Sequence, residues 1–210
     1  MRETETNSTE LDVLVRKYVP GDDMRQVHWG VSAKSGNLML RKRIGEEQQG
    51  VGILLSTHRC SKDQFEYLPI ENKMLETALA VAMYFINEGT SIVHFHRTEK
   101  MEMRHLGRLE QFDEYYEFVS RVVFTEDKGD ELSFSEVSHN NVLFECKAVF
   151  MIVHEWCEAT IKMMQLLNEN GVYTVVCIVN NEVDKESIAN KFSRTEIINI
   201  SPEDDLTEVL

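Results

Sequence analysis

Histidines, cysteines and one acid follow two apolar runs of the chain, at positions where their side chains could bind a metal ion. The first run is followed by His58 and Cys60, and the second by His154, Glu155 and Cys157. Imidazole nitrogens and thiolate sulfurs suit Zn²⁺ or Fe²⁺ better than Mg²⁺. The chain has no compact spacing such as Cys-x-x-Cys or His-Glu-x-x-His, so we favour a simpler interpretation of scattered histidines and small core cysteines.

Two other chemistries are open to these residue types. His94 and His96 would add two imidazoles on one face of a third apolar run, and a cysteine beside a histidine could form a nucleophilic dyad. With four cysteines and seven histidines, some adjacent pair is expected in almost any fold. The chain contains no Gly-x-Ser-x-Gly, Walker A or Gly-x-Gly-x-x-Gly sequence. We therefore expect a protein that is not an enzyme, with no catalytic residue and no cofactor.

The elements that would position these residues alternate between strands and helices. Apolar runs of strand length predict strands at 51–57, 91–96, 147–153, 172–179 and 195–201. Helical periodicity predicts helices at 71–89, 110–124, 134–145 and 157–171. Such alternation implies a doubly wound α/β fold, with a mostly parallel sheet and helices on both faces. The carboxyl edge of such a sheet is where ligands bind, and His58 and His154 would lie there.

Composition limits the class of protein. The chain has 210 residues, 42% of them hydrophobic and 28% charged, which is typical of one soluble globular domain or of one such domain with an appendage. No apolar run approaches the roughly 18 residues of a membrane helix, so we expect no membrane insertion by these residues. The cysteines lack framework spacing, which favours reduced thiols and a cytoplasmic location.

The charge is negative overall but unevenly placed. The net charge of −14 argues against a nucleic-acid partner. Between Val15 and Ile44, seven basic and two acidic residues give +5, which leaves −19 for the remainder. A basic arm of this kind could bind the acidic body of the same chain or an acidic or phosphorylated partner, and we favour the former.

The stretch "YVPGDDMRQVHWG" from Tyr18 to Gly30 concentrates turn and capping residues in a short span. Pro20-Gly21 predicts a turn, and Asp22 or Asp23 stands where a helix N-cap would be. Alternating residues predict strands before and after it, at 11–19 and 37–44.

This stretch resembles the bacterial family called domain of unknown function 58. The family pattern is Arg-x-Tyr-x-x-Gly-Asp-x-x-Arg-x-Ile-x-Trp, with Val27 replacing the isoleucine. Its anchors here are Arg16, Tyr18, Gly21, Asp22, Arg25 and Trp29. The first ten residues are polar and predict a frayed tail at 1–10. The resemblance implies a β extension at 11–50 and a von Willebrand factor type A-like domain at 51–210. It also implies a MoxR-type AAA+ ATPase as partner and membrane helices outside these residues.

Such domains often carry a metal-ion adhesion site for Mg²⁺, and the resemblance places it at Ser56, His58, Cys60, His154 and Glu155. No carboxylate occurs from Gln48 to Lys62, and Arg59 would bring a positive charge close to a cation. We therefore predict a degenerate site that binds no metal. The function expected from these features is a non-catalytic protein-interaction module of uncharacterised role. The alternative is a metal- or cysteine-dependent enzyme at the carboxyl edge of the sheet.

The family signature itself has a structural and a functional interpretation. As structure, the rings of Tyr18 and Trp29 would be buried against the larger domain, while Asp22 and Arg25 pair across a chain reversal. As function, Arg16, Arg25 and Lys34 would present a basic surface to a partner. We favour the structural interpretation, in which the stretch is a clasp that holds the β extension on the sheet.

Overall fold

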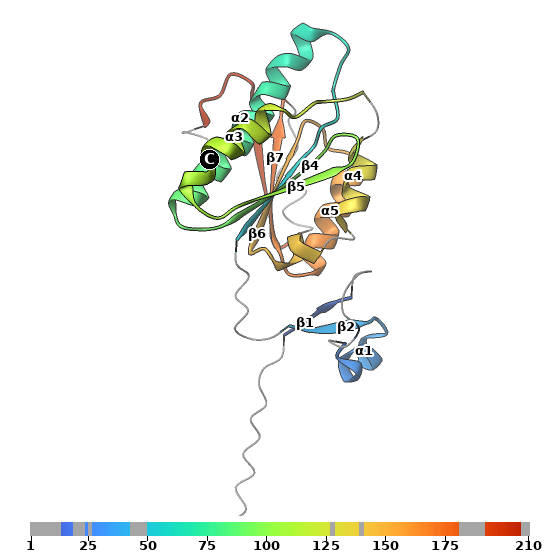
Figure 1. Ribbon diagram of the computed structural model, residues 1–210. Coiled ribbons are helices and arrows are strands. Elements are labelled where there is room, and N and C mark those ends of the chain that lie inside the picture. The colour runs from blue at the N-terminus through green and yellow to red at the C-terminus, as the bar shows by residue number, and fades with distance from the viewer. Residues whose placement is uncertain are drawn as a thin grey trace, which may run out of the picture. The chain divides into compact units, whose positions relative to one another are not determined.

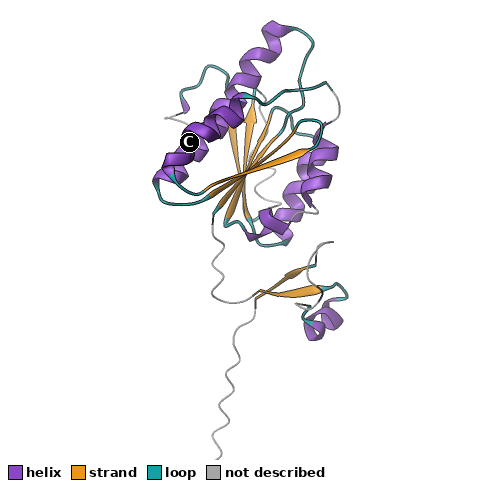
Figure 2. Cartoon of the chain, viewed as in Figure 1, coloured by secondary structure: helices purple, strands orange, loops and turns teal. Residues whose placement is uncertain are grey.

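The computed structural model describes residues 14–18, 24, 27–42, 50–126, 129–138, 141–180 and 192–206 (Figures 1 and 2). The chain divides into two compact units, residues 1–47 and residues 48–210. The predicted tail at 1–10 lies outside the described residues, as do Gly21, Asp22 and Arg25 of the family signature.

The N-terminal unit is a two-stranded antiparallel ribbon with one short helix. Strands β1 (Leu14–Lys17) and β2 (Met39–Lys42) pair, and helix α1 (Trp29–Ser35) lies between them in sequence. The Ser32 hydroxyl accepts a hydrogen bond from the Met39 backbone N–H at 2.7 Å, which joins the helix to β2. Leu40 and Val27 are buried and supply the core of this unit. The sequence pattern predicted both strands but missed the helix.

The larger unit contains a six-stranded sheet with the order β5-β4-β3-β6-β7-β8. Its strands are β3 (Val51–Leu55), β4 (Ile92–Arg97), β5 (Met101–Leu106), β6 (Ala148–Val153), β7 (Tyr173–Val179) and β8 (Thr195–Ile200). Every neighbouring pair is parallel except β4–β5, which is antiparallel. The predicted α/β fold with a mostly parallel sheet is therefore confirmed.

Helices cover both faces of this sheet (Figure 1). Helices α2 (Gln64–Asn87) and α3 (Phe112–Ser120) lie on one face, and α4 (Gly129–Ser138) and α5 (Glu158–Glu169) lie on the other. Two short 3₁₀ turns, Leu109–Gln111 and Asn141–Glu145, precede α3 and β6. Odd-numbered side chains of β3 pack against Met74 and Ala78 of α2, because alternate residues of a strand point to opposite faces.

In the larger unit, α2, the helix predicted at 134–145 and β5 differ from the sequence pattern. Helix α2 begins seven residues before the predicted start, because Asp63 caps it and accepts a hydrogen bond from the Phe65 N–H at 2.9 Å. The single helix predicted at 134–145 is α4 followed by a 3₁₀ turn. Strand β5 was not predicted, because an exposed edge strand that mixes charged and apolar residues lacks the apolar run of a buried one.

Candidate functional site

The ends of β3 and β6 meet at the carboxyl edge of the sheet. Leu55 lies opposite Ile152 in the parallel pair, and the next residue, Ser56, donates its backbone N–H to the Ile152 carbonyl at 2.9 Å. Thr57 donates its hydroxyl to the Arg97 carbonyl of β4 at 2.6 Å. Ser56 and Thr57 are both buried. The chain that leaves β3 is therefore fixed between its two neighbouring strands.

His58, His154 and Glu155 lie together at this edge. The two imidazole rings have their centroids 5.4 Å apart and are tilted by 35°. One ring nitrogen of each histidine and one carboxylate oxygen of Glu155 lie within 4.8 Å of one another. His154 is buried, while the other two residues are half-buried. Three of the five sequence-predicted metal-site positions are thus brought together.

The environment of His154 keeps its ring neutral. Burial lowers the pKa of His154, the Glu155 carboxylate opposes this shift, and the nearby His58 adds to it. Among the described residues, the Nδ1 atom of His154 is buried and has no hydrogen-bond partner. A neutral imidazole whose ring nitrogen makes no hydrogen bond is able to act as a metal ligand.

Arg59 does not present an unbalanced charge to these three residues. Its Nε donates to the Glu71 carboxylate of α2 at 2.7 Å, and its guanidinium carbon lies 3.9 Å from the centre of the Tyr67 ring. The hydrogen bond to Glu71 raises the pKa of Arg59, so the group stays charged, but its charge is balanced by its partner. The positive charge that the sequence brings close to a cation is thus partly balanced by Glu71.

The cysteines do not join the group. Cys60 is exposed, and partial burial of its thiol raises its pKa. The sulfur of Cys157 lies 3.3 Å from the Thr160 hydroxyl at the start of α5. Cys146 and Cys177 are buried, and burial raises the pKa of each thiol to about 12. Raised thiol pKa values work against a thiolate nucleophile.

His94 and His96 lie in the core beneath α3, apart from His58 and His154. The Nδ1 atom of His94 is 2.7 Å from the Tyr115 hydroxyl, and both rings pack against Phe118. Burial lowers the pKa of each histidine. The prediction of two imidazoles on one face is correct, and both fill the core.

The first turns of α2 add two exposed apolar side chains near this edge. Phe65 is 81% exposed and Leu68 is 45% exposed. The loop before α2 is held to the chain after α3, because the backbone N–H of Arg59 donates to the Thr125 carbonyl at 2.7 Å. Sequence reasoning missed these residues by starting the helix too late. The signal was present, since Asp63 followed by Glu66 is the spacing of a helix capping box.

The family signature is described in part. Arg16 lies in β1 opposite Leu40, and Tyr18 donates its backbone N–H to the Leu38 carbonyl at 2.8 Å. Trp29 begins α1 with 63% of its side chain exposed, so its ring is not part of the core of the N-terminal unit. Docking of this ring on the larger unit, and the Asp22–Arg25 pair, stay predictions.

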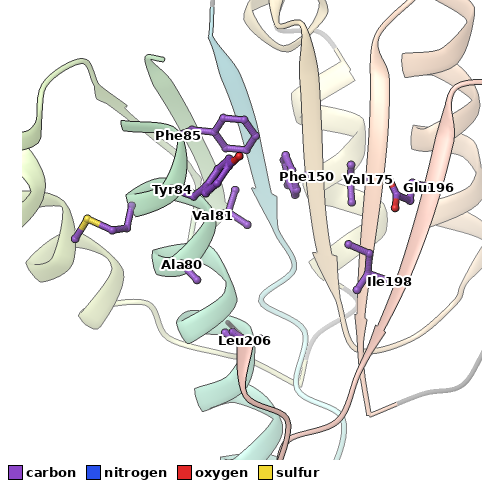
Figure 3. Close-up of a pocket in the computed structure, with 10 residues that line it drawn as sticks. Ala80, Val81, Tyr84, Phe85, Phe150, Val175, Glu196, Ile198 and Leu206 are labelled. Carbon is purple, nitrogen blue, oxygen red and sulfur yellow. The ribbon is translucent and has the colours of Figure 1, made fainter. Parts of the chain in front are cut away.

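A separate cavity of about 590 Å³ lies between α2 and strands β6, β7 and β8 (Figure 3). Tyr84 and Phe85 of α2, Phe150 of β6 and Ile198 of β8 line it, with Glu196 as a charged group at one side. His58, His154 and Glu155 do not line this cavity.

Comparison with known proteins gives a family match over part of the chain and several distant structural matches. Residues 14–105 match the family described as "Protein of unknown function DUF58", which confirms the resemblance in the signature. No curated protein matches the chain. Within the described ranges, no helix combines the length and apolar character that crossing a membrane requires.

The solved structures that the chain resembles are distant. The von Willebrand factor type A protein from Catenulispora acidiphila is 10% identical with a TM-score of 0.49, and the match covers 77% of this chain and 40% of that one. Proximal thread matrix protein 1 from the mussel byssus is 12% identical with a TM-score of 0.46, and the match covers 73% and 43%. The chain therefore spans less than half the length of either protein.

Proposed function

We propose that this chain, a DUF58 protein by its residues 14–105, is a non-catalytic protein-interaction module that binds its partner through the first turns of α2. The observation that carries the proposal is the exposure of Phe65, whose side chain is 81% exposed beside the carboxyl edge of the sheet. Large exposed apolar groups that gather on one surface are typical of binding sites.

Phe65 and Leu68 form one surface, which we call the α2 patch. Residues three positions apart in a helix lie on the same side of it, so both side chains are available to one partner. Asp63 caps the helix at Phe65, and the Ser61 hydroxyl donates to the Glu66 carboxylate at 2.6 Å. These bonds order the helix start before binding, which reduces the entropy lost on association.

The partner that the family resemblance suggests is a MoxR-type AAA+ ATPase, which would place the module in the cytoplasm. The charge outside the basic arm is −19, so an ATPase surface that combines an apolar socket with a basic rim would fit the patch and its surroundings. The same negative charge disfavours nucleic acid. No catalytic step belongs to this proposal.

Association of the whole chain with a purified MoxR-type ATPase tests the proposal, measured by biolayer interferometry. Phe65→Ser should weaken binding at least tenfold, which corresponds to about 1.4 kcal/mol and is typical of an aromatic residue central to an interface. Tyr84→Ser is the matched control, because Tyr84 is 64% exposed in the same helix but lies near its other end. That variant should bind as the wild type does.

The melting temperatures of both variants should equal that of the wild type, because neither ring is in the core. Equal losses of affinity in the two variants, or no loss in Phe65→Ser, would remove the α2 patch from the interface. If the wild type does not bind the ATPase at all, the proposed partner is wrong.

A further inference from the structure

We propose that His58, His154 and Glu155 form a site for one divalent transition-metal ion of the Zn²⁺ class. The inference goes beyond the interaction module and is independent of any partner. It rests on three features of the described residues: the meeting of the ligand atoms, the burial of His154 and the balanced charge of Arg59.

The backbone already brings the three ligands to one place. His58 follows β3 and the pair His154–Glu155 follows β6, and these strands are parallel neighbours. His58 is held from the other side by a bridge to Thr125, whose N–H donates to the Thr57 carbonyl at 2.9 Å. Ligands on elements fixed in this way need little ordering when a metal binds.

The donor atoms select the metal. Two imidazole nitrogens and one carboxylate oxygen suit Zn²⁺, Fe²⁺ or Co²⁺, whereas Mg²⁺ prefers an all-oxygen shell and keeps several waters. Three protein ligands leave one position of a tetrahedral Zn²⁺ site to water. The chain lacks the carboxylates that a Mg²⁺ site would need after β3, but a softer ion can still bind at the same edge of the sheet.

The present geometry needs only a small adjustment. A tetrahedral ion with metal–nitrogen bonds of about 2.1 Å holds its ligand atoms about 3.4 Å apart. The three atoms here lie within 4.8 Å of one another. Rotation of the half-buried His58 and Glu155 side chains can close this difference, which is at most about 1.4 Å, without moving the strands.

The electrostatics favour a cation here. The Nδ1 atom of His154 is buried without a partner among the described residues, which costs free energy, and coordination through this atom would remove that cost. Glu155 supplies a negative charge, and Arg59, the residue that follows His58, is already paired with Glu71.

Metal titration of the whole chain tests the site. The protein is treated with a chelator, exchanged into metal-free buffer and titrated with Zn²⁺ in a calorimeter, and Co²⁺ is followed by its visible absorption. We expect one equivalent of Zn²⁺ per chain, competition between the two metals and a Co²⁺ spectrum of four-coordinate intensity.

Two ligand substitutions and one control substitution test the ligand set. Glu155→Gln and His58→Gln should each weaken Zn²⁺ binding at least about tenfold, since even the outer partners of metal ligands commonly contribute that much. His105→Gln is the matched control, because His105 is an exposed histidine on β5. Both ligand substitutions are at half-buried positions, and circular dichroism checks that each variant folds.

The outcomes separate the possibilities. Absence of Zn²⁺ binding by the wild type, or equal binding by the wild type and both ligand variants, would overturn the site. An equal loss in His105→Gln would assign the metal to surface histidines and overturn it as well. Cys60→Ser should keep full affinity, and a tenfold loss there would replace the proposed ligand set with one that contains the thiol.

Discussion

Arg59 and Glu71 form a two-point ion pair that joins the loop after β3 to helix α2. The Nε atom of Arg59 donates to one carboxylate oxygen at 2.7 Å and its Nη2 donates to the other at 3.4 Å. The side chains are only 25% and 10% exposed, and Tyr67 stacks against the guanidinium. This pair is therefore better shielded from water than an ordinary surface ion pair.

Glu71→Ala should lower the free energy of unfolding by about 2–3 kcal/mol, because it leaves a half-buried guanidinium without its partner. Glu71→Gln should lower the free energy of unfolding by less, since an amide oxygen still accepts one hydrogen bond from Arg59. Glu117→Ala provides the control: it breaks an exposed pair with Arg121 and should cost under about 0.5 kcal/mol. Urea unfolding measures all three, and equal losses at Glu71 and Glu117 would contradict the prediction.

Stability should fall with acid because His94 is buried as a neutral ring. Burial lowers the pKa of His94 in the folded state, so between that value and about 6.5 the unfolded chain takes up a proton that the folded chain does not. The free energy of unfolding therefore decreases as the pH drops below about 6.5, by at most about 1.4 kcal/mol per pH unit for this group. His96 acts in the same direction.

His94→Gln should reduce this acid sensitivity while leaving a polar group near the Tyr115 hydroxyl. Urea unfolding at pH 7.5 and pH 5.5 gives the difference in stability for each protein. His105→Gln, at an exposed position, should behave like the wild type. An unchanged difference in His94→Gln would show that other groups cause the acid sensitivity.

Gly52→Ala should destabilise the larger unit. A Cβ atom at this position would lie 2.6 Å from a methyl carbon of Leu143, in the 3₁₀ turn before β6, and 3.0 Å from one of Val149 in β6, and both side chains are buried. We expect a loss of about 1–3 kcal/mol from overpacking. At Gly107 the nearest atom would be 3.8 Å away, so Gly107→Ala should be close to neutral in the same thermal melt.

Mg²⁺ should not raise the melting temperature. His58, His154 and Glu155 offer two ring nitrogens and one carboxylate, whereas Mg²⁺ prefers a shell of oxygen ligands. Millimolar Mg²⁺ should therefore not bind the folded state and should add nothing to its stability. Differential scanning fluorimetry with Mg²⁺ and with Zn²⁺ in parallel measures this. A rise with Mg²⁺ that a chelator reverses would restore the oxygen-ligand site that the sequence pattern excludes.

Trp29→Ala should change the free energy of unfolding by less than about 1 kcal/mol, because 63% of the side chain is exposed. Leu40→Ala in the same unit should cost about 2–5 kcal/mol, since Leu40 is buried. Calorimetric melting compares the two. A loss at Trp29 as large as that at Leu40 would mean that the ring docks on the larger unit, as the clasp interpretation expects.

Buried elements were the ones that sequence periodicity predicted well. Strand β3 is covered on both faces, so its residues form a continuous apolar run that marks a parallel strand without ambiguity. Helix α2 was recognised from its apolar stripe over Met74 and Ala78, but the predicted start at residue 71 left out its first turns, which begin at Gln64. Asp63 caps the first turn of the helix, which continues through Pro69.

The candidate site could be predicted in part. Strand order places the ends of β3 and β6 together, so the neighbourhood of His58 and His154 followed from topology. The directions of the side chains could not be predicted from topology, because they depend on contacts between residues distant in sequence. Arg59 is turned toward Glu71, and the His94 ring lies against the Tyr115 hydroxyl. Trp29 is 63% exposed, and the docking of its ring on the larger unit stays a prediction.

Strand β5 has a consequence for how the molecule behaves at high concentration. It closes one side of the sheet, and its exposed residues include Arg104, which pairs with Glu114 of α3 at 2.6 Å. A charged, antiparallel border of this kind makes it costly for a strand of a neighbouring molecule to add to the sheet, since the incoming strand would have to desolvate these groups. The irregular pattern that hid β5 in the sequence is thus a safeguard against aggregation along that border.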